Sequence, residues 1–134
     1  MLVRFDFPRT LDNLIDDVFA GDVTPFGSKF PAIDISEHEN ETVVIAELPG
    51  VQKEDVKIKF ENNVLTISGE RKPYEIPENA RILLNEMRVK EFSRSIEFEH
   101  DMDSGKISAE MKNGILTVRL PKAESARVHT IEVK

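Results

Sequence analysis

The sequence predicts an all-β domain that folds as a β-sandwich between residues 31 and 122. Short stretches in which apolar and polar residues alternate recur along this part of the chain. Turn residues such as Asn-Gly, Asn-Asn and Pro-Gly separate these stretches at short intervals. No helical pattern separates the first of them, which is typical of two packed antiparallel sheets.

Length and charge narrow the class of protein. The chain has 134 residues, enough for one domain with extended ends. Its net charge of −7 argues against nucleic acid or an anionic membrane as the main partner. The absence of cysteine excludes disulfides and thiolate metal sites. The first residues fit neither a signal peptide nor a membrane span, so we expect a soluble, cytoplasmic protein with no integral membrane association.

Residues 1–30 differ from the rest and form a predicted N-terminal arm. They hold five of the eight phenylalanines, and from Thr10 the apolar residues recur at helical spacing. A helix of about ten residues is too short to be stable alone in water, so its apolar face must dock on the domain's own core or on other chains. The loose connection from Gly21 to Pro31 favours an adhesive arm. Its expected binding residues are Phe5, Phe7, Leu11, Leu14, Ile15, Val18 and Phe19.

The first predicted strands lie between residues 31 and 69. Ile33 and Ile35 alternate with polar residues. The stretch from Thr42 to Leu48 is almost continuously apolar, which predicts that both of its faces are covered. A Leu-Pro-Gly-Val turn follows. Asn62-Asn63 predicts a second turn, between a strand that alternates at Val56, Ile58 and Phe60 and a strand with Leu65 and Ile67 facing inward.

Residues 70–91 interrupt the regular spacing of the strands. This connection is long for a compact domain, which calls for a reason. One possibility is that it folds back as a strand or a short helix on the same chain. The other is that it projects and pairs with an edge strand of a second copy. Its candidate pairing residues are Ile82, Leu83, Leu84 and Met87.

Arg94 is a charged residue on the apolar face of the strand predicted at residues 92–99. It shares one face with Phe92, Ile96 and Phe98. An unpaired buried guanidinium is costly, so Arg94 must pair with carboxylates or reach water at an edge. It is either an arginine at the edge of the sheet or one half of an ion pair across a dimer contact.

The best-defined element is a hairpin over residues 107–122. Apolar and polar residues alternate from Ile107 through Ala109 to Met111, and again after the turn at Leu116, Val118 and Leu120. Asn113-Gly114 between them is a strong signal for a two-residue turn. Ile115 interrupts the alternation and predicts a bulge or a register adjustment. Pro121 ends the second strand because it cannot donate a hydrogen bond.

A polar tail over residues 123–134 follows the hairpin. We expect Lys122, Glu124, Ser125 and Arg127 to be solvated and flexible. Ile131 and Val133 break the polar trend. They are either the last strand of the chain's own sheet or a short segment that adds to the edge of another sheet.

The sequence offers no site for chemistry. The three histidines have no ligand spacing, and motifs for a nucleophile or a phosphate loop are absent. Residues 101–105 resemble half of a calcium loop, but Gly105 comes one residue early and Glu110 falls at the wrong position. We therefore predict no catalytic residue, no cofactor and no metal, and the protein is not expected to be an enzyme.

Five segments in order resemble the small heat-shock proteins, which carry an alpha-crystallin domain. Ala109–Leu116 is similar to the A-x-x-x-n-G-[VI]-L signature of that family. Ala46–Arg71 resembles its first conserved block, and residues 92–98 resemble its F-x-R-x-F strand. Pro121-Lys122 closes the domain as in the family, and residues 131–133 resemble its C-terminal I-x-[IV] motif.

The resemblance implies an ATP-independent holdase that binds partly unfolded proteins and prevents their aggregation. It implies an immunoglobulin-like sandwich, a dimer made by exchange of the loop strand, and larger oligomers held by the tail motif. By matching, the motif docks in a groove between residues 56–60 and 106–111. The groove would be lined by Val56, Ile58 and Phe60, with Ile107, Ala109 and Met111 or their alternate positions.

One rival reading uses the same fold. A co-chaperone or adaptor with one defined partner could share the sandwich. It would have no use for the phenylalanine-rich arm or for the Ile131 and Val133 tail. The interpretation of the sequence is therefore an assembling chaperone whose partners are further copies of itself and unfolding client proteins.

Overall fold

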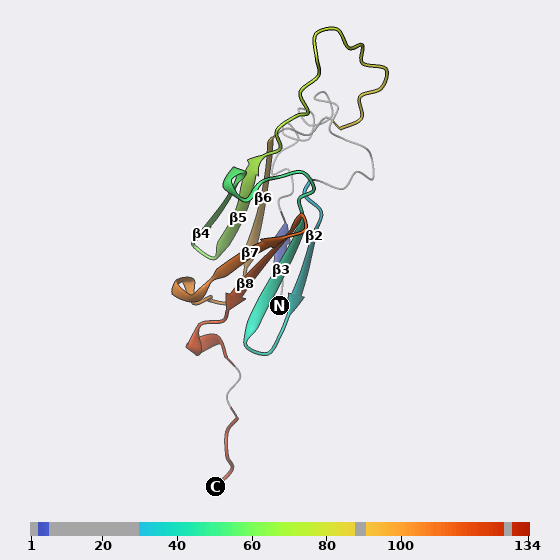
Figure 1. Cartoon of the computed structure of the whole chain (residues 1–134). Helices are drawn as coiled ribbons and strands as arrows, with labels where there is room; N and C mark the ends of the chain where they lie inside the picture. Colours follow the sequence, from blue (N-terminus) through green and yellow to red (C-terminus); the bar gives the residue numbers. More distant parts are fainter. Residues whose placement is uncertain (1–2, 6–29, 88–90, 128–129) are drawn as a thin grey trace, which may run out of the picture.

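The computed structural model describes residues 3–5, 30–87, 91–127 and 130–134, which form two packed antiparallel sheets (Figure 1). The first sheet has the order β1 (Val3–Phe5), β6 (Glu91–Phe98), β5 (Val64–Glu70) and β4 (Val56–Glu61). The second has the order β2 (Ile33–Glu37), β3 (Glu41–Glu47), β8 (Ile115–Pro121) and β7 (Ser108–Lys112). The predicted all-β sandwich is confirmed.

The predicted arm is described only in part. β1 falls within it, and the backbone of β1 pairs with β6 from Val3 opposite Phe98 to Phe5 opposite Ile96. Six of the seven binding residues predicted for the arm lie outside the described residues: Phe7, Leu11, Leu14, Ile15, Val18 and Phe19.

One apolar core lies between the two sheets. Each strand turns alternate side chains inward, so paired residues of neighbouring strands share a face. Leu116, Val118 and Leu120 of β8 face inward as predicted, and so do Leu65 and Ile67 of β5. The side chains with no exposed surface include Val44, Leu48, Leu65, Ile67, Ile96, Val118 and Leu120.

Two hairpins turn in two residues each, as the sequence predicts. Asn62 and Asn63 have φ of 52° and 60°, and Asn113 and Gly114 have 53° and 75°. Asparagine and glycine tolerate this left-handed region better than other residues, and the twist of the turn matches the strands. The predicted bulge at Ile115 is wrong, because the β7–β8 register continues without interruption from the turn and Ile115 simply faces outward.

Strand β3 is covered on one face and only partly on the other. Val43 points outward yet is buried, since Arg119 stands opposite it on β8 and reaches across to Glu41 with a 2.9 Å ion pair. Ile45 on the same face is 39 % exposed. The prediction that both faces of β3 are covered is therefore wrong at Ile45. On the outer face, the long side chain of Arg119 helps to cover Val43.

Thr42 carries a buried hydroxyl that the fold does not satisfy. Within the described part of the chain, its Oγ1 is the one buried side-chain oxygen or nitrogen without a hydrogen-bond partner. We expect Thr42→Val to raise the free energy of unfolding by about 1 kcal/mol, because an unpaired buried hydroxyl costs free energy. Urea denaturation checks this. Thr66→Val is the matched control, since Thr66 Oγ1 lies 3.2 Å from Ser95 Oγ and its loss should destabilise.

Lys122 is buried, contrary to the predicted solvated tail. Its Nζ donates to Glu37 Oε1 at 2.8 Å, and its backbone N–H donates to Asn40 O. Arg127 Nε in turn donates to Lys122 O at 3.3 Å. The β2–β3 hairpin thus binds the start of the tail to the sandwich. The sequence pattern did not indicate this contact.

Glu37→Gln is expected to destabilise the domain at pH 7 and to lose this effect in acid. The hydrogen bond from Lys122 holds the pKa of the Glu37 carboxyl below its ordinary value of 4.5. The carboxylate therefore adds stability above that value, and the contribution disappears as the pH falls through the lowered pKa. Because the Glu37 side chain is 35 % exposed, solvent screens the pair and the effect is on the order of 1 kcal/mol.

Urea unfolding at pH 7 and at a series of lower pH values measures this difference. Glu39→Gln, which changes an exposed carboxyl on the same hairpin, is the control. A loss of stability that stays the same down to the lowest pH at which the protein is folded would contradict the charged pair.

Candidate functional site: open sheet edges and projecting segments

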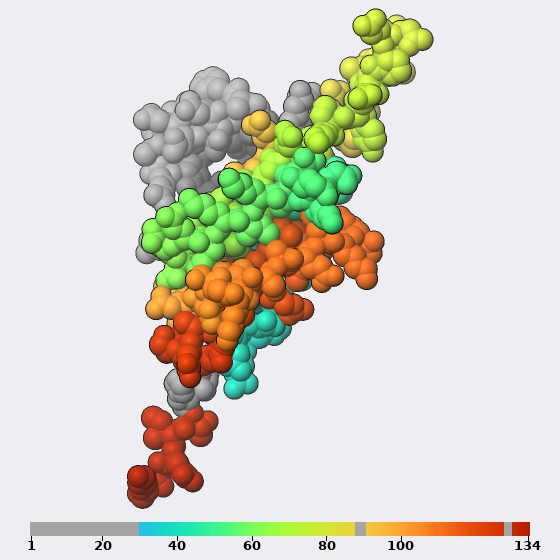
Figure 2. All heavy atoms as spheres, turned by 60° about the vertical axis from the view of Figure 1, so that its left-hand side comes forward, coloured from blue at the N-terminus to red at the C-terminus, as the bar shows by residue number. Residues whose placement is uncertain are grey.

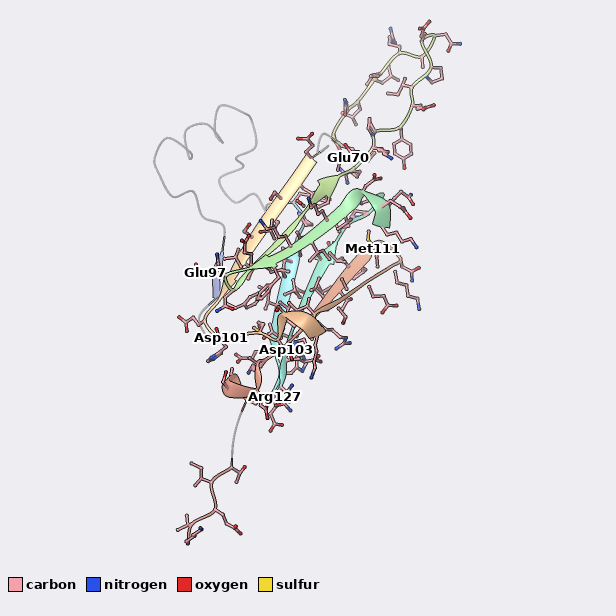
Figure 3. All side chains as sticks on the ribbon, turned by 90° about the vertical axis from the view of Figure 1, so that its left-hand side faces the viewer. Glu70, Glu97, Asp101, Asp103, Met111 and Arg127 are labelled. Carbon is pink, nitrogen blue, oxygen red and sulfur yellow. The ribbon has the colours of Figure 1, made fainter. Side chains whose placement is uncertain are left out.

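Two edge strands lie side by side at one border of the sandwich. β4 ends the first sheet and β7 ends the second, and each has a strand partner on one side only within the described residues. Figure 2 shows β4, in green, running above β7, in orange. Val56, Ile58, Phe60, Ile107 and Met111 are half-buried and pack against the core, and Figure 3 shows Met111 beside β4. With Ala109 they form the β4–β7 seam.

Ala109 marks an open place in the seam. It pairs with Val118, so its methyl group faces inward with the core residues. Even so Ala109 is exposed, whereas Val118 has no exposed surface. The seam therefore offers apolar side chains on both sides of a small residue, next to strand edges with free backbone groups. Of the two sets of positions that the sequence left open, Ile107, Ala109 and Met111 are the ones on the core side.

A contact between two turns holds the hairpin that carries the seam. Leu48 N donates to Gly114 O at 2.7 Å, and Pro49 Cα lies 3.5 Å from where a Cβ on Gly114 would stand. The Leu-Pro-Gly-Val turn itself closes with Val51 N donating to Leu48 O at 3.2 Å. These two turns belong to two of the segments that gave the family resemblance, and their contact ties the β7–β8 turn to the turn that follows β3.

The long connection projects from the sandwich as a loop (Figure 1). Residues 71–87 contain no strand or helix, so a folded-back element is not what this described part of the loop forms. Ile82, Leu83, Leu84 and Met87 are all more than half exposed, and so are Tyr74 and Ile76. Tyr74 and Ile76 were not predicted as pairing residues, although two large apolar residues between Pro73 and Pro77 were a visible signal.

Arg94 lies in the part of β6 that pairs with β5 opposite Ile67. On its other side β6 pairs with β1 only from Ile96 to Phe98, so within the described residues Arg94 lies at an open edge, and the reading as an edge arginine stays open beside that of a dimer ion pair. The guanidinium is half-buried on the inner face, in the same row as Ile58 and Ile67, and its Nη1 donates to Pro31 O at 2.8 Å. Whether it also takes part in a dimer contact stays a prediction.

The end of the tail stands apart from both sheets. Residues 130–134 form no strand, so the alternative of a last strand in the chain's own sheet does not hold. Ile131 is 86 % exposed and Val133 is 94 % exposed. Figure 1 shows this end of the chain extending away from the sandwich.

The acidic residues of the turn that precedes β7 make structural contacts. Asp101 Oδ1 accepts from Asn63 Nδ2 at 2.9 Å, and Asp103 pairs with Lys106 at 3.7 Å (Figure 3). In the part of the chain that the structure describes, no three His, Asp or Glu side chains gather as metal ligands would. Over the same residues, no helix has the length and apolar character to cross a membrane.

Comparison with known proteins agrees with this architecture. The Hsp20/alpha crystallin family matches residues 34–134. Heat shock protein 16 of Schizosaccharomyces pombe is 38 % identical over 132 residues, covering 92 % of this chain and 90 % of the relative. Small heat shock protein C2 of Rickettsia felis is 34 % identical over 130 residues, covering 92 % of this chain and 84 % of the relative.

Solved structures show the same fold. Heat shock protein 16.0 from Schizosaccharomyces pombe superimposes with a TM-score of 0.66 and 39 % identity, over 78 % of this chain and 97 % of that one. A small heat-shock protein of Xylella fastidiosa, described as having a distinct high order structure, gives a TM-score of 0.64 and 28 % identity, over 81 % and 99 % of the two chains. The chain belongs to the Hsp20/alpha-crystallin family of chaperones, the small heat shock proteins.

Proposed function

We propose that the protein is an ATP-independent holdase, which binds partly unfolded proteins, prevents their aggregation and works as an oligomer built from dimers. One observation carries the proposal. Every large apolar side chain that is more than half exposed in the described part of the chain lies on the loop or on the tail. Apolar surface is thus placed on projecting segments, while the core is closed. Such surface serves association and not chemistry.

The dimer would form by exchange of the loop. Residues 71–87 of the loop form no strand within their own chain. This segment exposes the apolar residues Ile82, Leu83, Leu84 and Met87. We expect the tail to bind at the β4–β7 seam. The other edge strand of the second sheet is β2, which lies at the opposite border from β7 and is open to the loop within the described residues. A loop strand of one copy added to β2 of the other would satisfy backbone groups on both. Arg94 would support this contact by an ion pair.

The tail would join dimers into larger assemblies. Ile131 and Val133 are two residues apart, so in an extended segment both point to the same side. The seam presents one apolar row on β4 and a second row in which the small Ala109 stands between Ile107 and Met111, which suits two branched side chains. Each contact is weak alone, but an assembly holds several, so avidity stabilises it while single contacts can open.

Clients would bind mainly to the arm. We divide the chain into an arm at 1–30, an alpha-crystallin domain at 31–122 and a tail at 123–134, and expect it to act in the cytoplasm. Phenylalanine and leucine side chains bind many apolar sequences without fixed partners. The net charge of −7 keeps a protein with so much exposed apolar surface in solution.

Client protection should be lost when the arm loses its apolar face. Because β1 pairs with β6, deleting the arm would also uncover that strand, so substitution is the cleaner change. We expect Leu11, Leu14, Val18 and Phe19 replaced together by serine to abolish most protection while the sandwich stays folded. Light scattering of several unrelated proteins heated with the full-length variant measures the effect. The control variant replaces Asp12, Asn13, Asp16 and Asp17 by serine.

Two outcomes would overturn the proposal. If the unmodified protein protects a single client or none, it is an adaptor with one partner and not a general holdase. If the apolar variant protects as well as the unmodified protein, the clients bind outside the arm.

A further inference from the structure

Phe30, the last residue of the arm, and Arg71, the first residue of the loop, lie in contact at the border of the sandwich. Phe30 lies against Phe92 edge to face, with ring centroids 5.5 Å apart and planes at 78°. Phe92 belongs to the buried core. Edge-to-face packing is a preferred geometry for two aromatic rings. The position of Phe30, where the chain enters the domain, is therefore set by the core.

Arg71 also lies against the ring of Phe30. Its guanidinium carbon is 5.0 Å from the centroid of the Phe30 ring, within the range of a cation–π contact. Arg71 is the first residue after β5, at the point beyond Glu70 where the loop leaves the sandwich (Figure 3). The first side chain of the loop thus packs on the last side chain of the arm.

Further contacts hold this point in place from two sides. Arg94 Nη1 donates to Pro31 O at 2.8 Å, and Pro31 is fully buried. On the opposite side, a Cβ on Gly50 would stand 3.5 Å from the Arg71 side chain, so the arginine stem rests on the Leu-Pro-Gly-Val turn. Gly50 has φ of +77°, which favours glycine and leaves this side open for the stem.

We propose that Phe30 and Arg71 are positioning residues that couple the direction of the arm to the direction of the loop. The contact joins the last residue of the arm to the first residue of the loop, and each of the two side chains also packs on the core or on a turn. We expect that weakening the contact from the loop side loosens the arm, and that weakening it from the arm side loosens the loop. This proposal rests on the proposed function, in which the loop joins two copies and the arm holds clients.

The chain lacks cysteine, so a single introduced thiol can report on each segment. We use Ser28→Cys for the arm and Glu75→Cys for the loop, each carrying a nitroxide spin label in the full-length protein. Arg71→Met keeps the aliphatic stem and removes the cation. Phe30→Leu keeps apolar contact with Phe92 and removes the ring face. Lys72→Met, which removes a neighbouring cation paired with Asp55, is the control.

Arg71→Met should reduce the immobilised fraction of the spectrum at Ser28 as well as at Glu75, and Phe30→Leu should do the same at Glu75. Combining the two changes should add little beyond either one, since both break one contact. Lys72→Met should leave the Ser28 spectrum unchanged.

The decisive result is the Ser28 spectrum of Arg71→Met, because Arg71 is half-buried at the border and its replacement leaves the core intact. An unchanged Ser28 spectrum in that variant overturns the coupling. Client protection measured on the same samples keeps the two proposals apart: its absence in the unmodified protein refutes the holdase, whereas the spectra alone decide the coupling.

Discussion

Replacing Ile131 and Val133 together by alanine is expected to reduce the assembly to dimers. The two side chains are almost fully exposed in the single chain, so in the proposed assembly their burial in the β4–β7 seam of a neighbour would drive docking. Shortening them removes about five methylene equivalents, worth roughly 4 kcal/mol if all are buried. Each tail contact would then weaken by about a thousandfold.

Native mass spectrometry reads the result directly. The matched control is Glu132→Ala, because Glu132 lies between the two apolar residues and points to the other side of an extended segment. The control should keep the mass of the unmodified protein. If the double variant keeps that mass too, the tail is not what joins the dimers.

Among the glycines that the structure describes, Gly69 is the one whose change to alanine is expected to reduce stability most. A Cβ at this position would stand 2.1 Å from Asp55 O and 2.9 Å from Phe92 Cζ. Real side chains do not approach a backbone oxygen so closely, so β5 and the turn before β4 would have to separate. We expect the free energy of unfolding to fall by about 3 kcal/mol or more.

Gly105→Ala provides the comparison within the same chain. A Cβ there would find Asp103 Oδ1 at 3.7 Å, an ordinary contact, and its backbone needs no left-handed conformation. Its effect should therefore lie within about 1 kcal/mol of zero. Urea denaturation of both variants measures the difference, and equal stability of the two would show that Gly69 is not tightly packed.

The sequence predicted correctly the turns and strands that depend only on residues close together along the chain. The turns at Asn62-Asn63 and Asn113-Gly114 follow from the backbone preferences of those residues. The alternation at Val56, Ile58 and Phe60 follows from the two faces of a strand. The row from Ile107 to Met111 was predicted for the same reason, and the structure places it beside β4.

Contacts between distant segments could not be predicted in this way. Lys122 is polar and near the end of the chain, and only its pairing with Glu37, 85 positions earlier, makes burial tolerable. Gly69 gave no turn signal, because its role is the close approach of Asp55 and not an unusual φ. Arg119 covers Val43 from the neighbouring strand, which no pattern along β3 contains.

A mixing experiment can show whether the tail of one chain occupies the β4–β7 seam of another. Ala109→Leu fills the exposed place in the seam and leaves the tail intact. The variant with Ile131→Ala and Val133→Ala leaves the seam intact and removes the tail. Each variant alone should stop at dimers, because every contact lacks one partner.

The measurement is the native mass of the two variants mixed in equal amounts. We expect the mixture to form species larger than dimers, since intact tails then meet intact seams. Masses that stay at the dimer in the mixture, while the unmodified protein assembles further, would contradict it.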